Sequence, residues 1–252
     1  MNDTLPVPYQ TPVPEIAALA ARYRRANGPV MSLMNRFGGQ VEAQMDLLPD
    51  AVRKQIEVLV GRALEGAHGL AKVGRRAPDL GGRAAPVLAA LTGAIGGFGG
   101  LATAIPELPV TVTLILHAIR RAAEAEGFDP DQPQVRAECL RVFAAGSPLG
   151  SDDGANTAFL GARLALTGTA VQTVIRAVAP RLAVALGQKL AAQAVPVVGA
   201  VSGAAMNAAF LTYYRELAVV RFSLLRLAQV HGAEATLGAF QSAVEPPTMI
   251  RN

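Results

Sequence analysis

Apolar residues recur every three or four positions along most of this chain, and that spacing is typical of amphipathic helices. The clearest example lies within residues 50–73, where charged side chains occupy the opposite face of the pattern. Similar patterns predict helices over residues 15–26 and 134–145, and a long helical run over residues 154–231. We therefore expect an all-α fold, built as a single-domain multi-helix bundle.

Residues 84–116 depart from this pattern, because Glu107 is their only charged residue. Their first half is rich in glycine, and Pro106 and Pro109 flank the glutamate. Proline suits the first turn of a helix, where its missing N–H has no partner to lose. We therefore expect one helix to end at Ile105 and a second to run from Glu107 to about Glu126, forming a central Gly-rich apolar helical hairpin. The segment from Gly127 to Pro130 is expected to end the second helix. A buried hairpin is the preferred interpretation, and insertion into a membrane is the alternative that length alone does not separate from it.

A second uncharged stretch covers residues 190–214. Small residues recur there at every fourth place, at Gly199, Gly203 and Asn207, a spacing that lets two helix backbones approach closely. At the ends of the chain, four prolines predict a flexible N-terminal arm over residues 1–14.

We expect residues 235–252 to form a loose tail. No boundary divides the residues between the arm and the tail, so residues 15–234 are expected to form one helical domain.

Composition indicates the environment of this bundle. Hydrophobic residues make up 51 % of the chain and charged residues only 17 %, where about 25 % charged is usual. The net charge of +4 suits an anionic membrane surface better than nucleic acid, since stacking aromatics and long basic runs are missing. The single cysteine excludes an internal disulfide, and the N-terminus does not resemble a signal peptide. We expect a cytoplasmic protein bound peripherally at the inner face of the membrane.

A basic link directly precedes the apolar stretch and contains Lys72, Arg75, Arg76 and Arg83. Basic groups near an anionic leaflet contribute about 1 kcal/mol each. We expect this link to contact lipid head groups, while the apolar helix surface, including Phe98 and Leu101, meets acyl chains. The alternative is an ordinary solvated connector. Arg163 and Arg176 lie inside apolar helical segments and are expected to pair with acids or to cap a helix end.

Candidate catalytic groups are few. Glu107 is an isolated carboxylate in an apolar run, which is costly and often functional, but a carboxylate also stabilises the start of a helix. We favour the cap. His117 and Cys139 form a conceivable dyad only through tertiary packing, and a cysteine in an amphipathic helix is usually a small core residue. The segment from Gly97 to Ala102 matches a dinucleotide fingerprint but lacks the preceding strand. No cofactor and no metal site is predicted.

Two segments resemble the EcsC family of bacterial proteins: GGFGGLATAIPELPVTVTLILHAIRRAAEAEGFD and PVVGAVSGAAMNAAFLTYYRELAVVRFSLLRL. The similarity covers roughly residues 20 to 230. The founding member of the family is encoded beside an ABC transporter, and the resemblance implies membrane association. The family has no agreed enzymatic activity, so the resemblance implies none for this chain. The positions carried over are motif and packing positions only: Gly97, Gly99, Gly100, Pro106, Pro109 and Asn207.

Together these observations predict a non-catalytic protein that binds lipid or a membrane-protein partner, with a transporter component suggested by family analogy. Two alternatives remain open. One is a hydrolase on a helical scaffold that uses Glu107 and His117. The other is a soluble interaction protein without membrane contact.

Overall fold

The structure is a computed structural model that describes residues 13–26, 51, 54–55, 58–64, 66, 101–145, 171–179 and 198–244. Side chains within residues 101–108 and 198–203, and that of residue 206, lie outside this description. The named helices are α1 (Val13–Ala26), α5 (Leu101–Ala125), α6 (Pro133–Ala144), α9 (Val198–His231) and α10 (Ala233–Val244). The described parts of residues 51–66 and 171–179 are also helical, and the described residues contain no strand. The predicted all-α fold is confirmed.

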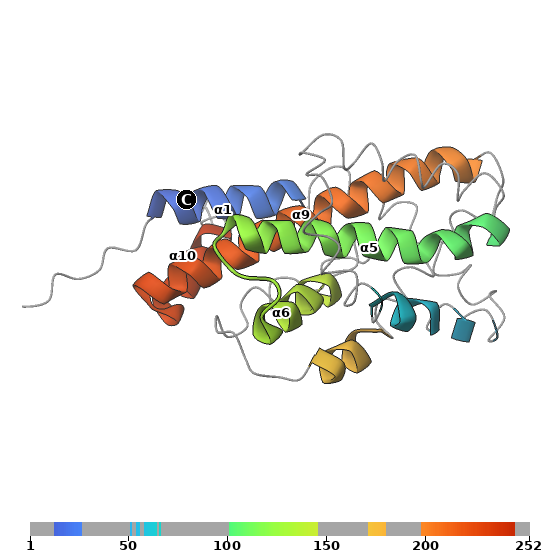
Figure 1. Cartoon of the computed structure of the whole chain (residues 1–252). Helices are drawn as coiled ribbons and strands as arrows, with labels where there is room; N and C mark the ends of the chain where they lie inside the picture. The colour runs from blue at the N-terminus through green and yellow to red at the C-terminus, as the bar shows by residue number, and fades with distance from the viewer. Residues whose placement is uncertain are drawn as a thin grey trace, which may run out of the picture.

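Helix α9 is the central element, and it contacts α1, α5, α6 and α10 (Figure 1). From Phe210 to Leu227 its side chains are buried on almost every side, which is the pattern of a helix surrounded by others. Helix α5 runs beside it in the same direction, with both C-terminal ends joined by an ion pair between Arg226 and Glu126. Helix α1 runs antiparallel to α9, because Glu15 also pairs with Arg226 while Arg22 pairs with Glu216.

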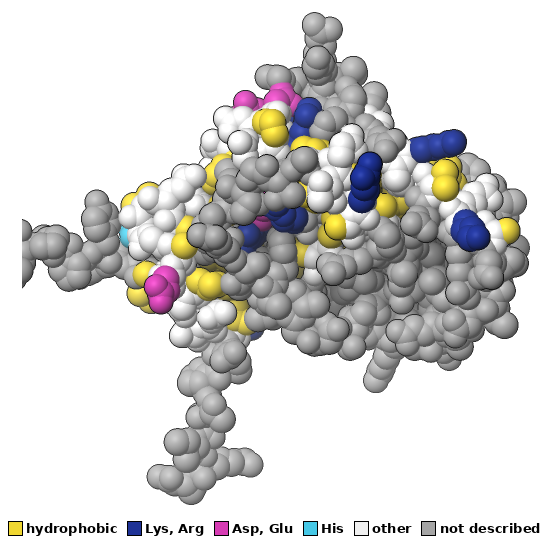
Figure 2. Space-filling model, turned by 90° about the horizontal axis from the view of Figure 1, so that it is seen from below, with side chains coloured by type: hydrophobic (Ala, Val, Ile, Leu, Met, Phe, Trp, Pro, Cys, Tyr) yellow, Lys and Arg dark blue, Asp and Glu magenta, His cyan; other side chains and the backbone are white. Residues whose placement is uncertain are grey.

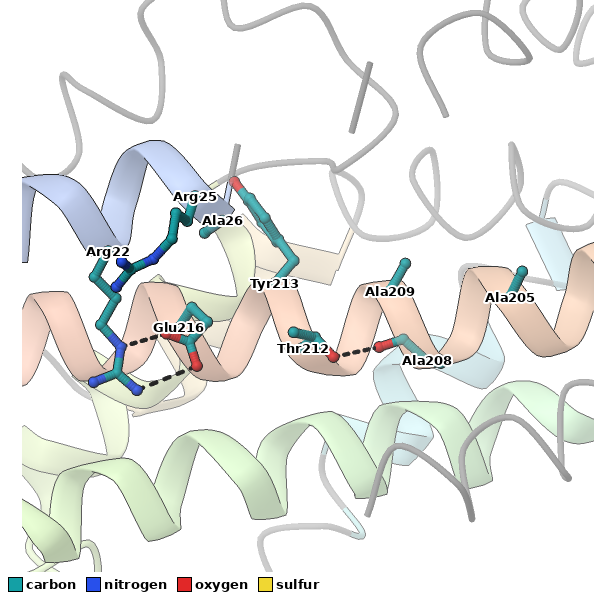
Figure 3. A pocket seen from close by; sticks show the side chains of 9 residues that line it. All are labelled: Arg22, Arg25, Ala26, Ala205, Ala208, Ala209, Thr212, Tyr213 and Glu216. Atoms are coloured by element: carbon teal, nitrogen blue, oxygen red, sulfur yellow. Dashed lines mark hydrogen bonds and ion pairs between the residues drawn. The ribbon is translucent and has the colours of Figure 1, made fainter. Parts of the chain in front are cut away.

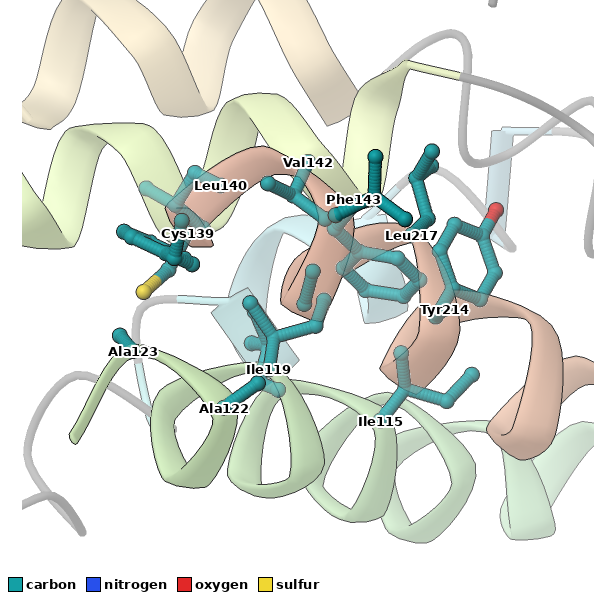
Figure 4. Packing of buried hydrophobic residues seen from close by; sticks show 14 of the residues in the cluster. Ile115, Ile119, Ala122, Ala123, Cys139, Leu140, Val142, Phe143, Tyr214 and Leu217 are labelled. Atoms are coloured by element: carbon teal, nitrogen blue, oxygen red, sulfur yellow. The ribbon is translucent and has the colours of Figure 1, made fainter. Parts of the chain in front are cut away.

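Aromatic rings fill the core where α5, α6 and α9 meet (Figure 4). The Phe143 ring of α6 stands edge-on to the Tyr214 ring of α9, with centroids 5.0 Å apart. Ile115 of α5 and Leu217 of α9 close the same cluster. Edge-to-face aromatic pairs contribute about 0.5–1.5 kcal/mol beyond the area they bury, so this cluster fixes α6 firmly against the two long helices.

The turn from α5 to α6 lies where the sequence predicts the end of the helix, at Gly127. Gly127 adopts a φ of 85°, a left-handed conformation that glycine takes without steric cost. The amide of Phe128 then donates to the carbonyl of Ala123 at 3.0 Å, which satisfies a carbonyl at the helix end. Phe128 itself is buried, 5.5 Å from the Phe222 ring centroid. Pro133 occupies the first turn of α6, as expected for proline.

The predicted turn at Pro106 and Pro109 is wrong. Helix α5 is continuous from Leu101 to Ala125 and passes through both prolines. Each proline removes one backbone hydrogen bond and adds a clash with the preceding turn, but the helix is held by its buried face, which includes Val112 and Ile115. Glu107 consequently lies inside α5 and does not cap its first turn.

The predicted C-terminal tail is also wrong over residues 235–244, which belong to helix α10 (Ala233–Val244). This helix folds back after Gly232, whose φ is 86°, and packs on α1 and α9. Its buried residues are Thr236 and Phe240, one turn apart, and the Phe240 ring lies 6.1 Å from that of Tyr23. Two buried side chains among small residues give too weak a pattern to separate a helix from a tail.

Candidate functional site

A cavity of about 500 Å³ opens between the C-terminal end of α1 and the middle of α9 (Figure 3). This volume lies within the range of about 300–1,000 Å³ that is typical of small-molecule sites. Among the described residues, its lining comes from these two helices: Arg22, Arg25, Ala26, Ala205, Ala208, Ala209, Thr212, Tyr213 and Glu216. The charged residues gather at one end and the three alanines of α9 lie toward the other, so the cavity is amphipathic along its length.

The charged end contains two arginines and one glutamate. Arg22 uses its Nε and Nη2 atoms to contact both carboxylate oxygens of Glu216, with Nη2 to Oε1 at 3.2 Å. This two-point geometry is the one that guanidinium and carboxylate groups favour. Arg25 is exposed and forms no ion pair with any side chain in the described part of the chain. The charged end therefore has one positive charge in excess.

The other end of the cavity is an alanine floor. Ala205 and Ala209 are one helical turn apart on α9 and project the same way. The Thr212 hydroxyl donates to the carbonyl of Ala208 at 2.8 Å, so its donor is already used within the helix. From Ala205 to Glu216 the helix rises about 16 Å. The result is an elongated apolar channel that leads to a cationic end.

A second group of charged residues is buried between α6 and α9. The Glu138 carboxylate is 1 % exposed and accepts from Arg221 Nε at 2.7 Å and from Arg141 Nη1 at 2.9 Å. The Arg221 side chain is itself 3 % exposed. These charged groups line neither of the cavities found in the described residues. We therefore assign the ion pairs a structural role, in which they hold α6 against α9.

The weak catalytic candidates do not converge. Glu107 and His117 are ten residues apart on the continuous helix α5, a rise of about 15 Å, so they do not form an acid–base pair. Cys139 is buried, and burial raises the pKa of its thiol to about 12. The thiol stays protonated at neutral pH, whereas the thiolate is the nucleophile that a Cys/His dyad needs.

The remaining predicted site residues divide into two groups. Leu101, Pro106 and Pro109 lie in α5, and the small residues of the second uncharged stretch lie in α9, where Asn207 is buried with 2 % exposure. The others lie outside the described residues and stay predictions: Lys72, Arg75, Arg76, Arg83, Phe98, Gly97, Gly99 and Gly100.

The family assignment comes from a family model. The EcsC protein family model matches residues 70–227, which is more than half of the chain. The chain belongs to the EcsC protein family. No curated protein and no solved structure matches it. The EcsC match includes α5, α6 and most of α9, while α1 and α10 lie outside it. The cavity is thus formed by one helix within the EcsC match and one beyond it.

The described residues carry neither a membrane-spanning helix nor a metal-ligand cluster. No helix among them combines the length and the apolar character needed to cross a membrane. No cluster of three or more His, Cys, Asp or Glu side chains arranged for a metal ion is found in that same part of the chain.

Sequence reasoning did not find the cavity. Arg24 and Arg25 resemble an ordinary solvated helix face, because basic residues are common in the last turn of a helix. Glu216 resembles a surface residue of an amphipathic segment. The signal that was present is the row of alanines at positions 205, 208 and 209, since small side chains on a helix face leave space beside it.

Proposed function

We propose that this EcsC protein is a non-catalytic binding protein that works in the cytoplasm, at the inner face of the membrane. The observation that carries the proposal is the distribution of charge. Residues 51–83 contain seven basic and three acidic side chains, an excess of four that equals the net charge of the whole chain. A segment with such an excess, where it faces the solvent, attracts anionic lipid over roughly a Debye length.

The described part of this segment supports the proposal. In residues 51–66, Val60 and Leu64 are buried in the core, while Lys54 and Arg62 are exposed. Val58 is 51 % exposed on the same segment and offers an apolar contact. The outer face of this helix therefore combines basic groups with an apolar side chain, as interfacial helices do.

The neighbouring described surface adds to this charge. Residues 51–66 and 171–179 lie along the lower side of the molecule in Figure 1, and Figure 2 views that side. On the right of this view the visible charged side chains are dark blue Lys and Arg, whereas farther left Lys and Arg lie next to magenta acidic side chains. Arg176 is exposed and has no ion pair with an acid among the described residues, so its expected pairing or capping role stays a prediction.

The hydrolase alternative receives less support, because α5 separates Glu107 from His117 along its axis. Family analogy favours a membrane-protein partner, such as a transporter component, beside the lipid surface. Such a partner would meet the same basic face once the protein is bound to the leaflet.

Vesicle co-sedimentation of the full chain tests the proposal. The protein is expected to bind vesicles that contain phosphatidylglycerol at low salt and to be released at high salt. The variant Lys54→Gln/Arg62→Gln should bind about 30-fold more weakly, since each basic group contributes about 1 kcal/mol near the surface. Arg24→Gln/Arg121→Gln removes the same charge from exposed positions elsewhere and is the matched control.

Two results would contradict the proposal. One is the absence of binding to anionic vesicles at low salt, which favours the soluble interaction protein. The other is an equal loss of binding in the control variant, which would show that net charge, and not this face, is responsible. Cell fractionation with salt washes provides the corresponding test in the cell, because a peripheral protein is released from membranes by salt.

A further inference from the structure

We propose that the cavity between α1 and α9 binds a single-chain amphipathic carboxylate, a long-chain fatty acid. The carboxylate would pair with Arg25, and the acyl chain would lie along the alanine floor of α9. This site is separate from the basic face that carries the proposed membrane binding, and its residues do not overlap with Lys54 and Arg62.

Charge complementarity identifies the head group. Glu216 neutralises Arg22 through two hydrogen bonds, so the excess at this end of the cavity is one positive charge, that of Arg25. A fatty-acid carboxylate carries one negative charge, whereas a phosphate monoester carries about 1.5 to 2. A guanidinium binds a carboxylate through two parallel hydrogen bonds. The local charge therefore matches a monocarboxylate better than a phosphate monoester.

The shape of the cavity identifies the rest of the ligand. The apolar part is one channel, floored by Ala205, Ala208 and Ala209 and walled by the Tyr213 ring (Figure 3). From Ala205 to Tyr213 it extends for about 12 Å along α9. A single extended acyl chain fits a channel of this form, whereas a two-chain phospholipid needs a wider one. The position of the arginines at one end sets the direction in which the chain would lie.

Equilibrium binding to the delipidated full chain, measured by calorimetry without vesicles, tests the proposal. Palmitate is expected to bind once per chain. Across a series from octanoate to palmitate, each added methylene should tighten binding by up to about fourfold while it is buried. Hexadecanol, which keeps the acyl chain but lacks the carboxylate, should bind at least about tenfold more weakly, because a hydrogen bond to a charged group is lost.

Matched variants locate the site. Arg25→Gln should weaken palmitate binding about tenfold or more, while Arg24→Gln should not, because Arg24 donates to the Ala243 carbonyl and lies outside the cavity. Ala205→Leu fills the channel from an exposed position and should also abolish tight binding. Ala235→Leu adds the same side chain at an exposed position of α10 and should leave binding unchanged. Circular dichroism confirms that each variant folds.

The result that overturns the proposal is palmitate binding that is absent, or that persists in both Arg25→Gln and folded Ala205→Leu. Tighter binding of a lysophosphatidic acid than of palmitate would also overturn it, because the head group would then be a phosphate. The basic-face variant Lys54→Gln/Arg62→Gln separates the two proposals. It should lose vesicle binding and keep palmitate binding, and Arg25→Gln should show the reverse.

Discussion

Substitution of the buried ion pair between α6 and α9 gives the sharpest test of how this bundle is held together. In Arg221→Met, the Glu138 carboxylate would remain buried at 1 % exposure with only Arg141 beside it. In Glu138→Met, the Arg221 guanidinium would remain buried at 3 % exposure without the carboxylate. Removing one partner of a buried pair typically costs about 3–5 kcal/mol, because a charge is left in an apolar interior.

The two single variants should differ. Arg221→Met should lie near the lower end of that range, since Arg141 Nη1 still contacts Glu138 at 2.9 Å. Glu138→Met should cost more, because it removes a buried carboxylate that contacts both arginines. The double variant Glu138→Met/Arg221→Met should cost far less than the sum, within about 1 kcal/mol of the original chain, because apolar side chains of similar size often replace a buried ion pair without loss.

Urea unfolding followed by circular dichroism measures these free energies, provided that the dependence of stability on denaturant is unchanged among the variants. The four proteins form a double-mutant cycle, which isolates the interaction between the two side chains. Costs of less than about 1 kcal/mol for both single variants would refute the reasoning. So would a double variant that loses the full sum of the single costs.

Two further predictions concern the thiol and the helix-terminal glycines. Cys139 should resist thiol reagents in the native protein and react once urea unfolds it. Burial raises the pKa of its thiol from 9.0 to about 12, so the unfolded chain loses this proton at a lower pH than the folded protein does. The free energy of unfolding should therefore fall as the pH rises from 9.0 toward 12, and it should fall less in Cys139→Ala. Rapid native labelling below pH 9.0 would contradict this. Gly232→Ala should destabilise the protein by about 1–2 kcal/mol, since its φ is 86°, whereas Gly238→Ala inside α10 should stabilise it by up to about 1 kcal/mol, because nothing lies within 4 Å of the added methyl group. Thermal melts compare the two, and equal effects would contradict the conformational argument.

Local patterns predicted the parts of the fold that depend on neighbouring residues. The helix ending at Ala26 and the helix after Pro133 were placed within two residues of their observed bounds. The turn at Gly127 and Phe128 was also predicted correctly. Glycine favours the positive φ that ends the helix, and an aromatic residue that can be buried follows it directly in the sequence. In each case the decisive interaction lies within a few residues along the chain.

Features that depend on distant partners were missed. Proline propensity predicted a break at Pro106, but tertiary packing of the same helix overrides propensity. The burial of Glu138 was not predicted, since its partner Arg221 is 83 residues away along the chain. A signal existed nonetheless: Arg221 stands between Val220 and Phe222 in an apolar run, and an arginine buried in such a run needs a carboxylate.

The small residues of α9 show why the cavity escaped prediction although its sequence signal was visible. At about 100° per residue, the row through Gly199, Gly203 and Asn207 lies about 200° around the helix from the row through Ala205 and Ala209. The first row includes a buried residue, Asn207, and its close packing at Gly199 and Gly203 stays a prediction. The second row lines the cavity, with Ala205 exposed. Small residues on the packed face bring helices together, whereas the same residues on the opposite face leave a hollow. The sequence alone does not say which face meets a partner, and only the position of α1 decides it.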